Sequence, residues 1–358
     1  MNQTIHPSDC LPNPVNIPEA QKSPPLRRMA ALLKMVLLIV CGFLLLTGYS
    51  QVSDENKQNA EKIKLMLAGT FAKPRILPGL QKFAIAQLSI TYKLNTSESV
   101  IGKERSTGAM AGAKLKAFLE TTDGELTQED FQEITDYFYH SFQRKLKAAG
   151  IDTVAWSAIA NTDFYKSQDD RKPEFDKEQV VIATNANNGN TLWAGKTGFA
   201  FGKIKKAMRF CDELGADAGY FYLTLDFADI LLDVKINSGE KQHMFFIEKT
   251  RTFKYSGAVI PRMVVSANTN ANAALSMLTN GKGGTETLVI MNNLEGDGGY
   301  SDKVSQDPSR LKRNLFAFAK SLNPVVIETT RAKYKEAAKQ SLDKYADAFI
   351  AKSVLLKK

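Results

Sequence analysis

The sequence predicts an α/β fold, in which a mixed β-sheet of about five to seven strands has helices packed on it and the chain closes with a long C-terminal amphipathic helix. The composition is that of a globular protein, since 44% of the 358 residues are hydrophobic and 24% are charged. Residues 83–94 are apolar on both faces of an extended segment, which is typical of a strand inside a covered sheet. Residues 127–150 and the C-terminal region instead show helical spacing of apolar side chains.

Residues 1–50 form a leader that precedes the fold. They contain the uncharged run 35–46, which suits the core of an export signal better than a membrane-spanning helix, because a span needs about 20 residues. The small residues Gly48 and Ser50 predict signal cleavage before Gln51. We therefore expect an exported protein, periplasmic or secreted.

A second interpretation of the leader is an uncleaved anchor. In it, residues 29–49 hold the chain in the inner membrane and the neighbouring basic residues stay on the cytoplasmic side. Beyond the leader the sequence has a single cysteine, Cys211, so an internal disulfide is not expected and Cys211 is predicted to be part of the core.

Composition divides the remaining chain into three parts. Residues 51–79 form a tether and loop, with a short helix at 61–68. Residues 80–307 form the α/β domain, which contains a polar insertion at 161–200. Residues 308–358 form C-terminal helices that pack on the same domain.

The first half of the α/β domain predicts a parallel crossover. Residues 83–94 form a strand, and Thr127 then caps a helix that Gly150 closes. Residues 151–159 follow as a second strand. Because a helix joins the two strands, we expect them to pair in parallel.

The second half predicts one helix and a series of strands. The helix covers residues 203–214 and ends at Gly215. A turn at 237–239 separates a long strand from its hairpin partner. The expected strands are 180–183, 218–235, 243–255, 259–266 and 287–291.

Two helices are expected after residue 307. Pro308 begins the first, which runs to Leu322, and Pro324 takes the first position of the second. The second helix has an apolar stripe that is expected to pack on the sheet. The stripe consists of Ile327, Tyr334, Ala338, Leu342, Tyr345 and Phe349.

The excess positive charge lies at the C-terminus. The chain has a net charge of +9, and residues 310–358 hold twelve lysines and arginines against four carboxylates. A basic surface is predicted at Arg331, Lys335, Lys339 and Lys352. It is either a solvated helix face or a face that meets an anionic surface such as lipid headgroups. Nucleic acid is not expected as a partner, because no basic motif interleaved with aromatic residues occurs.

No motif predicts a catalytic residue or a cofactor. The segment Gly195-Lys196-Thr197 resembles the end of a phosphate-binding P-loop, but Asn190 stands where the first glycine of that loop is required. His140 and His243 are the histidines beyond the leader, and neither has a nucleophile pattern beside it.

No metal site is predicted either. The two histidines lack metal-ligand spacing. Glu295, Asp297 and Asp302 surround glycines in a loop, yet their spacing does not match a calcium-binding EF-hand. Asp226 and Asp229 are expected on opposite faces of one strand, so they do not converge on one site.

The order of elements and one short motif resemble a known group of proteins. A helix ends in Leu-Lys-Ala-Ala-Gly at 146–150 before a strand, and another ends in Glu-Leu-Gly-Ala-Asp-Ala at 213–218 before a long strand and hairpin. Over residues 80–355 the arrangement resembles the exported α/β domain shared by the curli-secretion protein CsgG and the penicillin-binding-protein activator LpoB, in which this Gly-Ala-Asp motif recurs. The chain departs from that group in lacking a lipobox and in the insertion at 161–200. The resemblance implies a non-enzymatic part in envelope assembly or secretion.

These observations lead to one expected function and two alternatives. We expect an extracytoplasmic, non-enzymatic protein of bacterial envelope assembly or secretion that acts through contacts with an envelope protein. One alternative is a secreted protein that binds or hydrolyses a glycan or peptide, with an exposed Trp156 or Trp193 stacking on sugar. The other is a peripheral binder of anionic membrane surfaces that uses the basic C-terminal helix.

Overall fold

A computed structural model describes the chain at residues 52–67, 75–103, 110–166, 174–175, 179–183, 204–244, 247–268, 276–311 and 319–357. These residues belong to one compact unit, Val52–Lys358. The leader, the cleavage residues Gly48, Ser50 and Gln51, and the Gly195-Lys196-Thr197 segment lie outside the described residues. In the described part of the chain, no helix combines the length and apolar character needed to cross a membrane.

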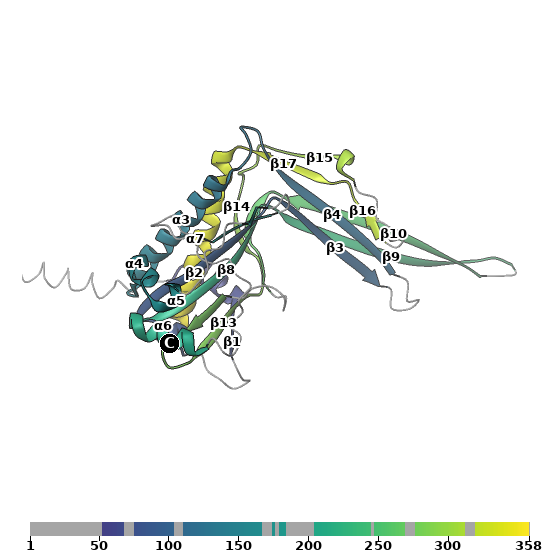
Figure 1. The fold of residues 1–358 in the computed structure, drawn as a ribbon. Helices are drawn as coiled ribbons and strands as arrows, with labels where there is room; N and C mark the ends of the chain where they lie inside the picture. The colour runs from purple at the N-terminus through teal and green to yellow at the C-terminus, as the bar shows by residue number, and fades with distance from the viewer. Residues whose placement is uncertain are drawn as a thin grey trace, which may run out of the picture. The chain divides into compact units, whose positions relative to one another are not determined.

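A large mixed sheet forms the centre of this unit (Figure 1). Seven of its strands follow the order β1-β13-β12-β8-β2-β7-β6, while β5 pairs with β2, and β11 pairs with β8 and β14. Strand β2 is parallel to β8 and β5 and antiparallel to β7. The strands are β1 (Ile63–Leu67), β2 (Lys82–Lys93), β5 (Asp152–Thr153), β6 (Glu174–Phe175), β7 (Gln179–Ala183), β8 (Asp217–Asp226), β11 (Arg262–Val265), β12 (Ser276–Thr279), β13 (Thr285–Ile290) and β14 (Leu294–Gly298).

The predicted fold class is confirmed, with helices packed on a mixed sheet. Residues 83–90 of β2 are buried without interruption, as the apolar pattern on both faces of this strand predicts. The long helices α3 (Gln128–Ala148) and α7 (Arg331–Leu356) run side by side and cover the sheet (Figure 1). The other helices among the described residues are α2 (Asp54–Lys62), α4 (Trp156–Ala160), α5 (Asp163–Lys166) and α6 (Ile204–Leu214), with the 3-10 helices η1 (Leu77–Gly79) and η3 (Pro308–Arg310).

The ends of α3 follow the local signals in the sequence. The Asp130 carboxylate accepts a hydrogen bond of 2.9 Å from the Thr127 N–H, which is one half of a capping box. At the other end Gly150 has φ 77°, the left-handed conformation that glycine adopts without steric cost. Both predicted boundaries of this helix are therefore confirmed.

Aromatic side chains join α3 and α7 to the sheet. The ring centroid of Phe142 on α3 lies 5.2 Å from that of Phe221 on β8 and 5.2 Å from that of Phe349 on α7. Phe349 also lies 6.1 Å from Phe83 on β2. Each of these rings is fully buried, so the predicted stripe of the C-terminal helix does form the contact with the sheet.

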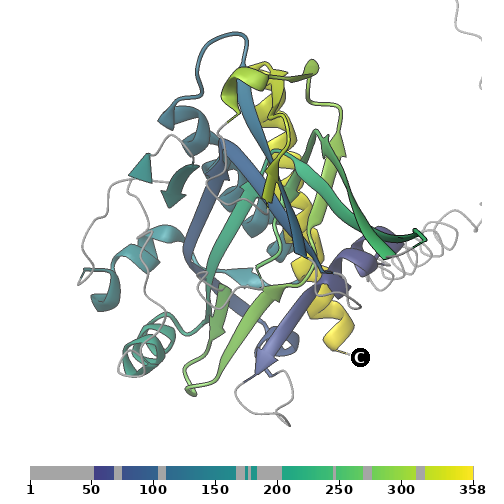
Figure 2. The same ribbon diagram turned by 90° about the vertical axis from the view of Figure 1, so that its right-hand side faces the viewer.

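A second sheet and a separate hairpin extend from the central sheet (Figures 1 and 2). The hairpin consists of β9 (Asp229–Gln242) and β10 (Ile247–Ile260), which pair along their full length. We call the set β3, β4, β9 and β10 the two-hairpin arm. The second sheet contains β3 (Asn95–Lys103), β4 (Met110–Thr121), β15 (Lys303–Gln306), β16 (Ala319–Ser321) and β17 (Val325–Thr329).

The two hairpins of the arm pack face to face around a small apolar cluster. Ala111 and Ala113 of β4 contact Val234 of β9, and Val100, Leu232, Ile236 and Tyr255 surround them. The small and polar residues of 95–121 carry a weak apolar pattern, which predicts no strand there. Strand pairing and the covering hairpin stabilise β3 and β4 here.

Several predicted strands have different boundaries. The strand predicted at 218–235 is two strands of different sheets, since the chain leaves the central sheet after Asp226 and enters β9 at Asp229. The predicted turn at 237–239 lies inside β9, where those residues pair with residues 250–252. The strand predicted at 151–159 stops at Thr153, and α4 follows.

The prediction of two helices after residue 307 is wrong for the first helix and for the start of the second. Pro308 begins only a 3-10 turn, and Pro324 precedes strand β17 instead of opening a helix. Ile327 is therefore a buried strand residue that pairs with Leu119 of β4. The helix begins at Arg331, after Thr330, whose hydroxyl accepts a 3.3 Å hydrogen bond from the Lys333 N–H.

The segment predicted as a tether is also ordered into the fold. Asp54–Lys62 form α2, which contacts α7, and Ile63–Leu67 form β1 at the edge of the central sheet. Strand β1 pairs antiparallel with β13, from Ile63 opposite Ile290 to Leu67 opposite Glu286. Of the short helix predicted at 61–68, residues 61–62 end α2, whereas residues 63–67 form a strand, because this sheet edge supplies backbone partners.

Candidate functional site

The predicted basic residues of α7 face carboxylates of α3. Arg331 Nη2 lies 2.6 Å from Asp130 Oδ2, and Lys335 Nζ lies 3.4 Å from Asp130 Oδ1. Glu133 accepts from both Lys335 and Lys339, each at 2.7 Å. Three of the four predicted cations are thus brought together, but as an interhelical ion-pair network with carboxylates.

The network is reflected in the pKa values of its carboxyl groups. Burial opposes ionisation of Asp130, but the Thr127 N–H and the Arg331 guanidinium outweigh it and hold the pKa of Asp130 below its usual value. Hydrogen bonds from Lys335 and Lys339 lower the pKa of Glu133. These α7 cations are therefore engaged within the fold.

Lys352, the fourth predicted cation, lies farther along α7 and does not join this network. Partial burial lowers the pKa of Lys352, Glu61 acts in the opposite direction, and Lys64 adds to the lowering. The predicted basic surface is accordingly divided between an ion-pair network and one separate lysine.

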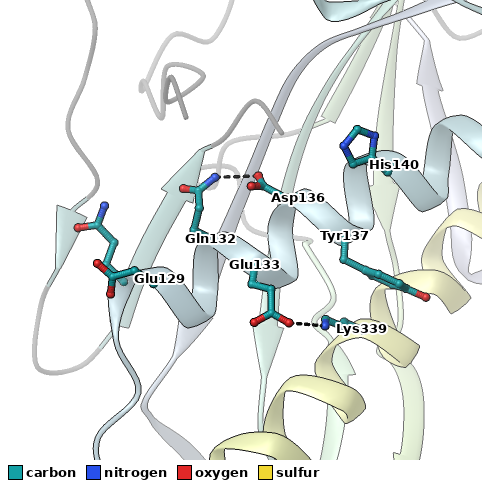
Figure 3. Close-up of a pocket in the computed structure, with 8 residues that line it drawn as sticks. Glu129, Gln132, Glu133, Asp136, Tyr137, His140 and Lys339 are labelled. Atoms are coloured by element: carbon teal, nitrogen blue, oxygen red, sulfur yellow. Dashed lines mark hydrogen bonds and ion pairs between the residues drawn. The ribbon is translucent and has the colours of Figure 1, made fainter. Parts of the chain in front are cut away.

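An open cavity of about 670 Å³ runs along the outer side of α3 (Figure 3). Gln132 Nε2 donates a 2.7 Å hydrogen bond to Asp136 Oδ1, and Glu133 and Tyr137 point toward Lys339. His140 projects from the end of this face, so the polar groups point in different directions and do not converge on one point. The lining residues are Gln128, Glu129, Gln132, Glu133, Asp136, Tyr137, His140 and Lys339.

Trp156 cannot stack on a sugar in this structure. Its side chain is only 2% exposed and packs edge-on against Tyr139 and Tyr165, with ring centroids 6.5 and 4.9 Å away. Trp193 lies outside the described residues. The alternative of a glycan-binding cleft therefore loses its support from Trp156.

Cys211, Glu295 and Asp302 are each buried or paired. Cys211 is buried, and burial raises the pKa of its thiol to about 12, so the thiol is protonated at neutral pH. Glu295 pairs with Arg262, and Asp302 pairs with Lys333. Among the described residues, no group of three or more His, Cys, Asp or Glu side chains is placed to hold a metal ion.

The two-hairpin arm exposes a long strand edge. Strand β10 pairs with β9 over fourteen residues, from Ile247 opposite Gln242 to Ile260 opposite Asp229. No other strand in the described part of the chain pairs with β10. A free strand edge carries unpaired backbone N–H and C=O groups that can pair with another chain.

Side chains along the hairpin alternate between a packed and an open face. Val234 and Tyr255 face the apolar cluster, whereas Lys235 and Lys254 lie opposite each other on the open face. An open cavity of about 550 Å³ lies where the hairpin meets β3. Its lining residues are Glu98, Ser99, Val100, Ile230, Leu231, Leu232, Asp233, Ser256, Gly257 and Ala258.

Hydrogen bonds to Asp226 connect the two-hairpin arm to the central sheet. Asp226 is 9% exposed, and it accepts hydrogen bonds from Thr96 Oγ1 at 2.7 Å and from the Ala228 N–H at 3.4 Å. Burial raises its pKa to about 6, although these hydrogen bonds act in the opposite direction. The Tyr300 hydroxyl donates to the Phe227 carbonyl, and Thr329 Oγ1 donates to the Tyr300 carbonyl at 2.7 Å.

The sequence predicts a strand through Asp226 but does not predict this junction. The available signal was a carboxylate at the end of an apolar run, followed by Phe227-Ala228 and a second extended segment. No protein-family model matches the chain, and no curated protein or solved structure matches it at a significant level.

Proposed function

We propose that this chain is an exported, non-enzymatic protein of the bacterial envelope that binds another protein through its two-hairpin arm. The observation that carries the proposal is the free edge of β10, a strand of fourteen residues. Such a strand measures about 48 Å at roughly 3.4 Å per residue. An extended segment of a partner can add to it through backbone hydrogen bonds.

The side chains of β10 suit an acidic partner segment. Arg251 and Lys254 are exposed, and Lys254 lies opposite Lys235 across the hairpin. Like charges on directly opposite residues destabilise a strand pair, and Asp233 lies 3.9 Å from Lys235 and partly offsets its charge. A carboxylate on an added strand can do the same for Lys254.

The rest of the unit holds the arm in place. The base of β9 follows Asp226, which is bonded to Thr96 at the start of β3. Both hairpins of the arm therefore leave the central sheet at one hydrogen-bonded junction. A pre-organised binding strand loses less conformational entropy when the partner docks.

Export and the envelope role rest on the leader and on the resemblance in element order. The uncharged run 35–46 and the small residues before Gln51 support export. Membrane binding through α7 has less support, because Arg331, Lys335 and Lys339 all pair with α3 carboxylates.

Site-specific photocrosslinking in the native host tests the proposal. A photoreactive amino acid at Lys254 of β10 is expected to give one adduct of defined mass, which mass spectrometry then identifies. The matched control is the same group at Lys147, an exposed lysine of α3. Equal adducts from both positions, or none from Lys254, would contradict binding at the arm.

A further inference from the structure

A recessed cavity lies on the five-stranded sheet, on the opposite face from the one that β9 covers. The buried residues Ala111 and Ala113 of β4 face the hairpin, so the alternating residues Lys114 and Lys116 take part in the other face. The cavity has a volume of about 200 Å³. Its lining residues are Lys114, Lys116, Arg310, Leu311, Ser321, Leu322 and Pro324.

Lys114 and Lys116 bring two cations to this cavity with no carboxylate opposite them. Their cross-strand neighbours on β3 are Ser99 and Ser97. Within the described residues neither lysine forms an ion pair or a side-chain hydrogen bond. This contrasts with Lys335 and Lys339 of α7, which both pair with Glu133.

Arg310 is fixed at the rim of the cavity. Its Nε lies 3.0 Å from Asp307 Oδ2, its Nη2 pairs with Glu120, and its guanidinium carbon lies 5.0 Å from the centre of the Phe118 ring. These two carboxylates offset the charge of Arg310 and leave one further negative charge at the rim. The three cations still exceed the two carboxylates, and the net positive charge of the cavity comes from the two lysines.

We propose that this cavity binds a phosphate group. Lysine ammonium groups act as point charges toward phosphate, and the Ser321 hydroxyl adds a hydrogen-bond donor beside them. Leu311 and Pro324 add apolar groups to the lining, which lowers the local dielectric constant and strengthens the charge interaction. The volume is several times the roughly 30 Å³ that one water molecule occupies in the liquid, which is enough for a compact tetrahedral anion.

The phosphate can come from free inorganic phosphate or from a lipid headgroup, and the two sources are distinguished by experiment. The site is separate from the β10 edge, so it does not depend on the proposed function. Full-length chain is titrated with inorganic phosphate at constant ionic strength, with chloride as the reference anion, and binding is followed by isothermal calorimetry. In parallel, the chain is sedimented with vesicles of equal parts phosphatidylcholine and phosphatidylglycerol.

The test variant is Lys114→Gln with Lys116→Gln. Its matched control is Lys103→Gln with Lys147→Gln, which removes the same charge from exposed positions of β3 and α3. We expect one saturable site for phosphate, for the vesicles or for both, weakened at least tenfold in the test variant and less than twofold in the control. Circular dichroism verifies that both variants are folded.

The two binding experiments identify the source of the phosphate. Binding of free phosphate identifies a soluble anion, and binding of the vesicles alone identifies a lipid headgroup. The proposal is overturned if neither the calorimetry nor the vesicle sedimentation shows binding, or if chloride binds as tightly as phosphate. It is also overturned if the control variant loses as much affinity as the test variant.

Discussion

Thr96 Oγ1 donates a 2.7 Å hydrogen bond to the carboxylate of Asp226, which joins the start of β3 to the last residue of β8. The central sheet and the arm meet at this bond. Asp226 is almost fully buried and has a pKa of about 6, compared with ~3.9 for an exposed aspartate. The junction therefore responds to pH.

The pH dependence of stability tests this junction. Because the folded chain holds the Asp226 proton more tightly than the unfolded chain does, the contribution of this group falls as pH rises from about 4 to 6. Asp226→Asn is expected to remove that decrease, which amounts to about 3 kcal/mol at pH 7. Urea unfolding at several pH values measures it. An unchanged slope in Asp226→Asn, or the same change in Asp229→Asn, would contradict the assignment.

The ion-pair network between α3 and α7 predicts that removal of Asp130 lowers the free energy of unfolding. Asp130→Ala deletes both the capping acceptor for the Thr127 N–H and the partner of Arg331. The expected decrease in the free energy of unfolding is about 2–4 kcal/mol. Since the folded pKa of Asp130 is lowered, this stabilisation is present above about pH 4 and is lost on acidification. Glu125→Ala, at an exposed position, is the control and is expected to change stability by less than about 0.5 kcal/mol.

Gly219 of β8 predicts a steric limit in the central sheet. A Cβ at this position would overlap the Phe83 ring and lie 2.7 Å from a ring carbon of Phe221. Gly219→Ala is therefore expected to cost about 1–3 kcal/mol through overpacking. At Gly79 an added Cβ meets no atom within 4 Å, so Gly79→Ala serves as the control. Thermal unfolding compares the two, and equal melting temperatures would refute this packing.

Removal of a buried hydrogen-bond acceptor at Glu286 is also expected to lower the free energy of unfolding. Its buried carboxylate accepts the N–H groups of Ile76 at 2.8 Å and Leu77 at 3.1 Å. Glu286→Gln replaces one acceptor oxygen by an NH2 donor, which leaves a backbone N–H without its partner. The expected loss is about 1–3 kcal/mol by urea unfolding. Glu213→Gln on α6 is exposed and should have no measurable effect.

Local signals explain the elements that the sequence predicts well. The start and end of α3 depend on Thr127, Asp130 and Gly150, which lie next to the boundaries they set. The buried strand β2 follows from its continuous apolar pattern. In both cases the deciding contacts are close in sequence, or the element is buried on every side.

The arm could not be predicted in the same way. Nothing local in Asp226-Phe227-Ala228 shows that the chain changes sheets there, because the break depends on Thr96 and Tyr300 from distant segments. The ion pairs of the basic residues could not be predicted for a similar reason, since the carboxylates that pair with α7 belong to α3. At β17, by contrast, the β-branched run Val325-Val326-Ile327 favours a strand, and this preference outweighs the helix-start signal of Pro324.

A pair of adjacent proline variants tests whether a partner docks at the free edge of β10. In an antiparallel hairpin, successive residues direct their N–H groups alternately toward the partner strand and toward the free edge. Of Thr252→Pro and Phe253→Pro, one therefore removes an N–H from the β9–β10 ladder and the other removes an N–H from the free edge of β10. Both variants are combined with the photoreactive group at Lys254, and hydrogen exchange identifies the one that retains the hairpin. We expect this variant to lose its crosslinked partner although its hairpin is intact. An undiminished adduct from a variant that lacks the outward N–H would contradict docking at the β10 edge.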